Sequence, residues 1–293
     1  MISAEILRKV RRIEIISRKA SRELLAGEYH SAFKCRGMEF SEVREYEPGD
    51  DIRLIDWNVT SRTGRLYVKQ FIEEREMTVI LALDLSASLA FLSNRKSKQE
   101  VAAELSALIA FTAMLNNDKV GLLLFTDSVE RYIPPRKGRT HLLRIIREIL
   151  TFSPRSGGTS IQTGLAYLNR VCRRHAIVFL ISDFLDRDFE SPLKVTARKH
   201  DLVALRIMDP RERNLPPRGL FRGRDLETGR EILLDFSRRR TVRSFVAARE
   251  ERDRELASTF RSVRVDTIEV HDDASPEKPL FDFFLKRRRR LRR

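Results

Sequence analysis

The stretch Leu81–Ser88, with the sequence LALDLSAS, decides the fold class of this chain. It begins as an uninterrupted apolar run, which is typical of a strand buried on both faces of a parallel sheet. It ends on the carboxylate of Asp84, followed by the hydroxyls of Ser86 and Ser88 at alternate positions. Because ligands of open α/β sheets bind beyond the carboxyl ends of the strands, the stretch predicts a central strand with a site at its end.

Similar apolar runs follow along the chain and alternate with helical patterns. Strands separated by helices indicate a parallel sheet covered on both faces, so we predict a doubly wound, mostly parallel, Rossmann-like α/β domain. The expected strands are 78–83, 120–125, 177–181, 202–207 and 265–270. The expected helices are 98–115, 141–150, 161–173, 192–199 and 237–260.

Different patterns precede and interrupt this domain. Apolar residues at three- and four-residue steps predict an amphipathic N-terminal helix over 5–25, and turn signals between β-prone pieces predict hairpins over 29–76. We expect another hairpin at 218–236 to pack with these hairpins as a small β-hairpin subdomain. The predicted divisions are 1–76, 77–210, 211–236, 237–272 and 273–293.

The composition is that of a folded globular protein, because 42% of the 293 residues are hydrophobic and 34% are charged. The net charge is +15, and seven of the basic residues lie in 286–293. The apolar residues just before them are Phe281, Phe283, Phe284 and Leu285. Residues 281–293 therefore suit an anionic membrane surface, although we favour docking of these aromatics on the domain. We expect a cytoplasmic protein, with a position peripheral to the inner membrane as the alternative.

Two more junctions carry oxygen side chains to the same edge of the predicted sheet. Thr159 follows a Gly-Gly pair just before the helix at 161–173, and Asp183 follows the strand at 177–181. Hydroxyl and carboxylate oxygens are ligands that suit Mg²⁺ or Mn²⁺. Each residue alone could be a cap for backbone donors, but their convergence favours a metal site. Its predicted ligands are Asp84, Ser86, Ser88, Thr159 and Asp183.

A charged block at 44–57 has two interpretations. It is either a partner-docking face or a structural turn in which Trp57 is a buried anchor and Arg53 pairs with Asp56. We slightly prefer the structural interpretation, because Ile52, Ile55 and Trp57 are expected to need burial. The candidate partner-binding residues are Arg44, Asp50, Asp51, Arg53, Asp56 and Trp57.

These motifs resemble two known patterns. Asp84, Ser86 and Ser88 with Thr159 and Asp183 are similar to the DxSxS, Thr and Asp elements of the metal-ion-dependent adhesion site (MIDAS) of von Willebrand factor A-like domains. The block Pro48–Trp57, PGDDIRLIDW, together with neighbouring motifs, resembles the signature of domain-of-unknown-function family 58. This resemblance implies an adaptor role beside MoxR-type AAA+ ATPases, with no established catalytic activity. One departure is Phe184, where many adhesion sites have Gly, and this change is expected to narrow access to the metal.

The leading hypothesis is a non-catalytic adaptor whose Mg²⁺ binds an Asp or Glu of a partner. A Mg²⁺-dependent phosphohydrolase with Asp84 as nucleophile is the alternative, but Ser86 stands where such enzymes usually have a second Asp. Nucleic-acid binding through the basic end ranks third, because the aromatics cluster together and do not alternate with the charges. The sequence contains no phosphate-binding Gly-rich motif, so we expect no nucleotide binding.

Overall fold

The computed structural model describes residues 4–25, 29, 32–33, 38–73, 76–90, 97–209, 219–224, 231–271 and 275–291. The chain divides into two compact units. Unit 1 contains Met1–Ala32 and Thr78–Arg293, and unit 2 contains Phe33–Met77. The N-terminal helix therefore belongs with the α/β domain. The predicted division at 1–76, which grouped this helix with the hairpin region, differs from the structure.

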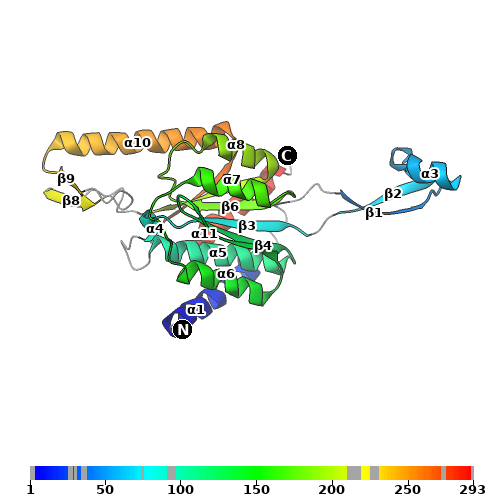
Figure 1. The fold of residues 1–293 in the computed structure, drawn as a ribbon, viewed down its shortest axis with the longest axis horizontal. Coiled ribbons are helices and arrows are strands. Elements are labelled where there is room, and N and C mark those ends of the chain that lie inside the picture. The colour runs from blue at the N-terminus through cyan, green and yellow to red at the C-terminus, as the bar shows by residue number, and fades with distance from the viewer. Residues whose placement is uncertain are drawn as a thin grey trace. The chain divides into compact units, whose positions relative to one another are not determined.

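A six-stranded sheet forms the centre of unit 1, in the order β10-β7-β6-β3-β4-β5 (Figure 1). All neighbouring pairs are parallel except β5, which lies antiparallel to β4 at one edge. The predicted mostly parallel α/β sheet is confirmed, and β5 is an element that was not expected. The strands are β3 (Thr78–Asp84), β4 (Lys119–Phe125), β5 (Val129–Arg136), β6 (Ile177–Ser182), β7 (Asp201–Met208) and β10 (Asp266–His271).

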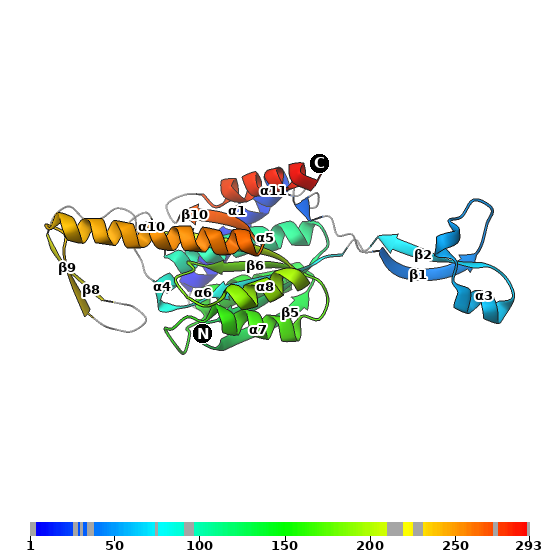
Figure 2. The ribbon, with the colours of Figure 1, turned by 90° about the horizontal axis from the view of Figure 1, so that it is seen from above.

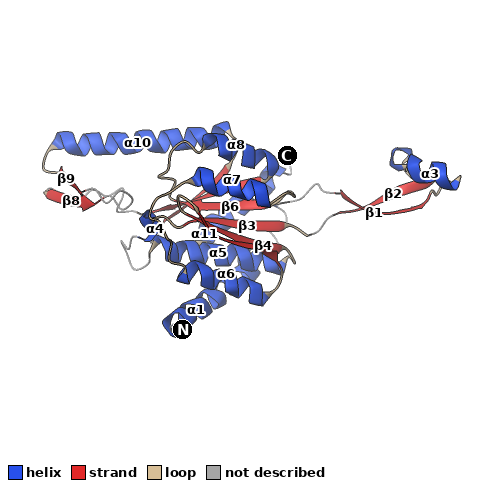
Figure 3. Ribbon diagram, viewed as in Figure 1, coloured by secondary structure: helices blue, strands red, loops and turns tan. Residues whose placement is uncertain are grey.

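Helices cover both faces of the sheet, as Figure 3 shows by secondary structure. One layer contains α1 (Ala4–Ala20), continued by η1 (Ser21–Leu25), with α5 (Lys98–Leu115) and α6 (Arg139–Thr151). The other contains α7 (Ile161–Val171), α8 (Glu190–Lys199) and part of α10 (Arg239–Ser262). The short helix α4 (Ala87–Ala90) follows β3 directly and marks the carboxyl edge of the sheet.

Helix α5 is buried on nearly all sides because its small and apolar residues let it pack between the sheet, α1 and α6. Its start is fixed by a capping box in which the Ser97 side chain accepts from Glu100 N and the Glu100 side chain accepts from the Ser97 backbone. In the described residues, no helix is long and apolar enough to cross a membrane.

Helix α10 extends beyond the carboxyl edge of the sheet in both views (Figures 1 and 2). The strands β8 (Leu220–Arg224) and β9 (Glu231–Asp235) pair antiparallel beside its N-terminal half. The Phe236 ring joins them to the helix, with centroids 5.6 Å from Phe221 and 5.8 Å from Phe245. This hairpin belongs to unit 1 and forms a sheet of its own, so the prediction that it joins the 29–76 hairpins in one subdomain is wrong. The turn expected at 225–230 lies outside the described residues.

The basic C-terminal segment is the helix α11 (Glu277–Leu291), which packs beside the edge strand β10. Phe284 is fully buried and meets Tyr29 edge-on at 5.6 Å, and Phe283 is 7% exposed. Arg287 pairs with Asp201 and, at 3.2 Å, with Asp266. The favoured docking of the aromatics is therefore confirmed for these two rings, which are not available to a membrane surface.

Unit 2 is a single hairpin with a long connection. Its strands β1 (Met38–Glu45) and β2 (Tyr67–Glu73) pair antiparallel, and the connection contains the 3-10 turn η2 (Ile52–Leu54) and the helix α3 (Trp57–Thr63). Asp56 caps α3 by accepting from the backbone of Asn58 and Val59 at 2.9 and 3.2 Å. In the described part of 29–76, the expected series of hairpins is thus one hairpin with the helix α3 in its connection.

Gly164 lets α7 approach the sheet closely. A Cβ at this position would lie 2.8 Å from the Phe125 ring, which is fully buried and cannot move aside. Gly164→Ala should gain about 1 kcal/mol of helix propensity but lose about 1–3 kcal/mol to overpacking. We expect net destabilisation in denaturant unfolding, whereas Gln162→Ala, at an exposed position of the same helix, should leave stability almost unchanged. Equal or higher stability of the Gly164 variant would contradict this packing.

Candidate metal site at the carboxyl edge of the sheet

Two predicted carboxylates are brought to one edge by the pairing of β3 with β6. Leu83 lies opposite Ile181 in this parallel register, so Asp84 and Asp183 follow at the ends of adjacent strands. Both are buried, at 0% and 3% exposure. The Asp84 Oδ2 accepts from Ser182 Oγ at 2.7 Å, and its Oδ1 accepts from Ser86 N at 2.8 Å. These donors fix the orientation of the Asp84 carboxylate.

The two predicted hydroxyls lie side by side in the loop after β3. Ser86 Oγ and Ser88 Oγ are 2.9 Å apart, and the two residues are 0% and 9% exposed. Leu85 N donates to Phe125 O at 2.8 Å, which continues the β3–β4 pairing one residue past Asp84 and fixes the start of the loop. The alternation noticed in the sequence therefore brings both hydroxyl oxygens to one side of Asp84.

Thr159 lies in a loop that is attached to two strand ends. Ala87 N donates to Gly157 O at 3.0 Å, and Ser160 N donates to Thr126 O at 2.9 Å. Thr159 itself is partly exposed. Four of the five predicted ligands thus form one buried group, and the fifth lies in a loop bonded to the Ser86–Ser88 turn. Whether they bind a metal stays a prediction.

The electrostatics of the site are unfavourable for an ionised Asp84. Burial, and next the negative charge of Asp183, raise the pKa of Asp84 to about 7, although the hydrogen bonds from Ser182 and Ser86 act in the opposite direction. Two buried carboxylates at adjacent strand ends favour a cation beside them. A positive charge placed beside these carboxylates would therefore be stabilised.

One charged residue of this site, Lys98, is not predicted by the sequence pattern. Lys98, the first residue of α5, extends its Nζ to within 3.3 Å of Asp183 Oδ2, and both side chains are 2% exposed. Its position in the sequence is indistinguishable from that of a solvated lysine at a helix start. Asp209, at the end of β7, is also buried. Within the described ranges, however, no three His, Cys, Asp or Glu residues gather as metal ligands.

Phe184 has a left-handed backbone, with φ of 56°, at the position where the resemblance led us to expect glycine. Its ring is buried in the core and meets Phe260 of α10 edge-on at 5.1 Å. It packs with core residues of α8 and α10, and its effect on access to the carboxylates stays a prediction.

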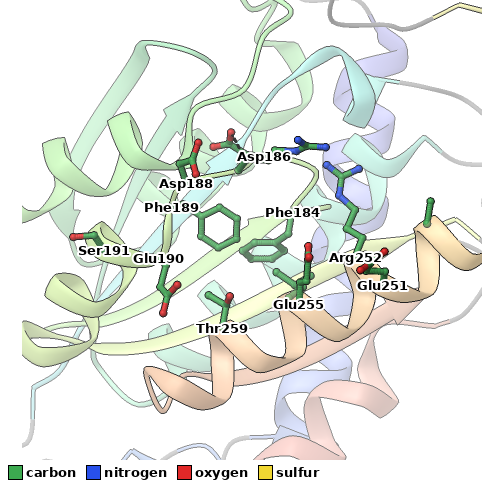
Figure 4. A pocket seen from close by; sticks show the side chains of 13 residues that line it. Phe184, Asp186, Asp188, Phe189, Glu190, Ser191, Glu251, Arg252, Glu255 and Thr259 are labelled. Carbon is green, nitrogen blue, oxygen red and sulfur yellow. Dashed lines mark hydrogen bonds between the residues drawn. The ribbon is translucent and has the colours of Figure 1, made fainter.

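A cavity of about 740 Å³ lies between α10 and the loop after β6 (Figure 4). Phe184 and Phe189 lie on its inner side, and Arg252 reaches across to donate to Leu185 O at 2.5 Å. This contact attaches α10 to the loop that carries Asp183. The acidic residues in its lining are Asp186, Asp188, Glu190, Glu251 and Glu255.

Two other acids near this edge of the sheet have local structural roles. Asp186 accepts from Ile161 N at 2.7 Å and so caps the start of α7. Asp127 lies in the turn between β4 and β5 and accepts from Ser156 Oγ at 2.7 Å. Neither belongs to the group around Asp84.

The candidate partner-binding residues in unit 2 form internal ion pairs. Arg44 binds Asp50 through two hydrogen bonds of 2.8 and 2.6 Å, which hold the pKa of Asp50 below its ordinary value. Arg53 pairs with Asp51 and not with Asp56 as predicted, because Asp56 caps α3 and lies 3.7 Å from Lys69.

The apolar residues of the same block are distributed differently from the prediction. Ile55 is buried and bridges to Val68, but Ile52 is 68% exposed and Trp57 is 65% exposed. The interpretation of Trp57 as a buried anchor is therefore wrong. Trp57 and Ile52 are therefore large apolar side chains that unit 2 leaves exposed.

Comparison with known proteins identifies the family. The family described as protein of unknown function DUF58 matches residues 42–255. The chain belongs to this family. An uncharacterized protein of Mycobacterium tuberculosis is 30% identical over 96% of this chain and 89% of its own length. The uncharacterized protein YeaD of Bacillus subtilis is 26% identical over 37% of this chain and 25% of its own.

Solved structures resemble the DUF58 chain only distantly. The conserved hypothetical protein BatB from Bacteroides thetaiotaomicron has 18% identity and a TM-score of 0.48, over 73% of this chain and 99% of that one. A proximal thread matrix protein of mussel byssus, solved with a zinc-occupied MIDAS motif, has 19% identity and a TM-score of 0.37, over 45% of this chain and 38% of that one.

The raised pKa of Asp84 predicts a pH dependence of stability. Between its ordinary pKa of 3.8 and about 7, the folded state retains a proton that the unfolded chain has lost. Raising the pH from 5 to 8 without divalent ions should therefore lower the free energy of unfolding by roughly 3 kcal/mol. Mn²⁺ should reverse the trend because it favours the ionised form. Unfolding curves of the wild type and Asp84→Asn test this, and an identical pH dependence of the two proteins would contradict it.

Proposed function

We propose that this protein is a non-catalytic adaptor whose α/β unit is a von Willebrand factor A-like domain with a metal-ion-dependent adhesion site. Asp84, Ser86, Ser88, Thr159 and Asp183 would hold Mg²⁺ or Mn²⁺. The bound ion would supply the positive charge that bridges to an Asp or Glu of a partner. The chain contributes oriented oxygens and a dry surrounding in which such a contact is strong.

The observation that carries the proposal is the pair of buried carboxylates at adjacent strand ends. Asp84 and Asp183 repel each other, and this repulsion contributes to the raised pKa of Asp84. A hard divalent cation would relieve that repulsion, and the paired hydroxyls of Ser86 and Ser88 add neutral oxygen ligands. Hydrogen bonds from Ser182 and Ser86 N orient the Asp84 carboxylate in advance. The chemistry of this donor set fits Mg²⁺ or Mn²⁺.

The geometry gives less support to turnover. A nucleophilic Asp84 would need an accessible oxygen, yet this residue is 0% exposed and both of its oxygens accept hydrogen bonds. Ser86 is also unable to act as the second carboxylate of a phosphohydrolase site. Recognition of a carboxylate requires neither a nucleophile nor a general acid.

The family resemblance points to a MoxR-type AAA+ ATPase as the partner. The exposed Ile52 and Trp57 of unit 2 support a second, apolar contact with a protein partner, because large apolar side chains dominate the energetics of interfaces. The partner would therefore present a carboxylate to the metal site and an apolar surface to Trp57.

Removing the Asp84 charge should abolish metal binding without unfolding the protein. Asp84→Asn keeps the shape and one acceptor oxygen for Ser86 N, and its amide nitrogen can donate to the Ser182 hydroxyl. It should weaken Mg²⁺ and Mn²⁺ binding by about a hundredfold or more, since a charged ligand is lost. Asp188→Asn, at an exposed position of the loop after β6 and outside the ligand group, is the matched control. Calorimetric titration measures the metal affinities. Binding of a MoxR-type ATPase, compared in Mg²⁺ and in EDTA, measures whether loss of the metal weakens partner binding. Equal metal affinity of Asp84→Asn and wild type would refute the site.

Trp57→Ala should weaken the complex with the same ATPase by about tenfold or more. Its ring is 65% exposed, so the melting temperature and metal affinity should remain unchanged. Val195→Ala, which removes another exposed apolar side chain (54%) on α8, is the control. Surface plasmon resonance with immobilised ATPase measures the dissociation constants of the variant and the wild type. Unaltered binding by Trp57→Ala would exclude the surface around Trp57 from the interface.

A further inference from the structure

Lys98 is a buried cation inside the proposed metal site. Its side chain runs from the first residue of α5 to the end of β6, where Nζ lies 3.3 Å from Asp183 Oδ2. Both side chains are 2% exposed. Taking an ammonium out of water costs several kcal/mol, so a lysine in this position must be compensated by the carboxylates around it.

The helix itself does not explain this placement. The first turn of a helix carries a partial positive charge, which disfavours a lysine and favours an acidic residue. Glu100 supplies the favourable charge and completes the capping box with Ser97. The local preferences of α5 therefore oppose a buried lysine here, and the site at the sheet edge favours it.

The charges at the site show what the lysine does. Asp84 and Asp183 are both buried at the ends of the adjacent strands β3 and β6, where two negative charges repel each other. The Lys98 ammonium contacts one member of this pair at 3.3 Å, so it neutralises part of the charge that a divalent ion would neutralise. A metal ligated by Asp183 and the ammonium would compete for the same carboxylate.

We propose that Lys98 is the built-in cation of this site and sets its metal affinity. This inference rests on the proposed function. Without metal, the ammonium balances Asp183 and keeps the two-carboxylate site folded. When Mg²⁺ or Mn²⁺ binds, the ammonium is displaced from Asp183 or opposes the ion through its charge. Lys98 therefore lowers the affinity for the ion and makes the metal-free state stable.

The test compares Mn²⁺ binding by variants that differ in the charge at this position. Lys98→Met removes the charge and retains much of the volume, so Mn²⁺ should bind about tenfold tighter or more. Lys98→Arg keeps the charge and should bind close to the wild-type level. Lys9→Met is the control. It removes a lysine of α1 that pairs on the surface with Glu100 of α5 at 2.6 Å, and it should not change the Mn²⁺ affinity. Isothermal titration calorimetry of the full chain measures all four proteins.

Stability gives an independent readout. In EDTA, Lys98→Met leaves Asp183 without its ammonium and should melt roughly 5–10 °C below the wild type. Saturating Mn²⁺ should restore most of this loss and should raise the melting temperature of the variant more than that of the wild type. Should Lys98→Met fail to fold in EDTA, Lys98→Gln removes the charge but keeps a hydrogen-bond donor, and its Mn²⁺ affinity is expected to exceed that of the wild type.

The outcomes separate the two proposals. Equal Mn²⁺ affinity in the wild type and the uncharged variants overturns the role of Lys98 and leaves the metal site standing. Absence of Mn²⁺ binding in every variant overturns both. Tighter binding that disappears in the double variant Lys98→Met, Asp84→Asn supports both, because it locates the gain at the carboxylate pair.

Discussion

The repulsion between Asp84 and Asp183 is the constraint on which the candidate site depends. The parallel pairing of β3 with β6 imposes this repulsion, because its register brings both carboxylates to the same edge of the sheet. The core that surrounds the strands excludes water, and this raises the cost of each ionised carboxylate. The protein meets that cost with the Ser182 hydroxyl, the Ser86 backbone and the Lys98 ammonium. In the proposed function, these partners keep the site folded without metal and leave the two carboxylates as ligands for a cation.

The loop after β6 shows how the fold maintains this arrangement. A left-handed Phe184 costs about 1–3 kcal/mol of backbone strain. Burial of its ring against Phe189 and Phe260 recovers a similar amount, since a fully buried phenylalanine contributes about 1.5–3 kcal/mol. Arg252 then binds Leu185 O from α10. The position of Asp183 is therefore coupled to α10, the helix that also carries the β8–β9 hairpin beyond the sheet edge.

The sequence predicts the central elements well because their signals are local. The strands β3, β4, β6 and β7 are apolar on both faces, and the predicted ends of α5 match the observed ones. Strand β5 was missed because Pro134 and Pro135 argue against a strand, and an edge position tolerates them. Helix α11 was missed because its basic run is typical of a solvated tail. Only the folded chain places Asp201 and Asp266 beside Arg287.

The same distinction applies to the candidate site. Asp84, Ser86 and Ser88 are adjacent in sequence, and Asp183 follows a recognisable strand, so their convergence follows from the topology of a parallel sheet. Lys98 could not be found in this way, because nothing in its surroundings along the chain distinguishes a buried ammonium from a surface one. Trp57 gives the converse case, since its size predicted burial and the small unit 2 leaves it exposed.

The burial of Lys98 and the exposure of Trp57 escaped prediction for the same physical reason. The burial of a long or large side chain depends on which elements pack over it, and local pattern is silent about that packing. Both residues also stand where the packing conflicts with ordinary preference: a charge inside and a tryptophan outside. Such conflicts cost free energy that a purely structural role does not recover, and they concentrate where a protein binds something. The proposed metal site and the proposed contact surface of unit 2 are therefore supported by the same argument, although they lie in separate units of the chain.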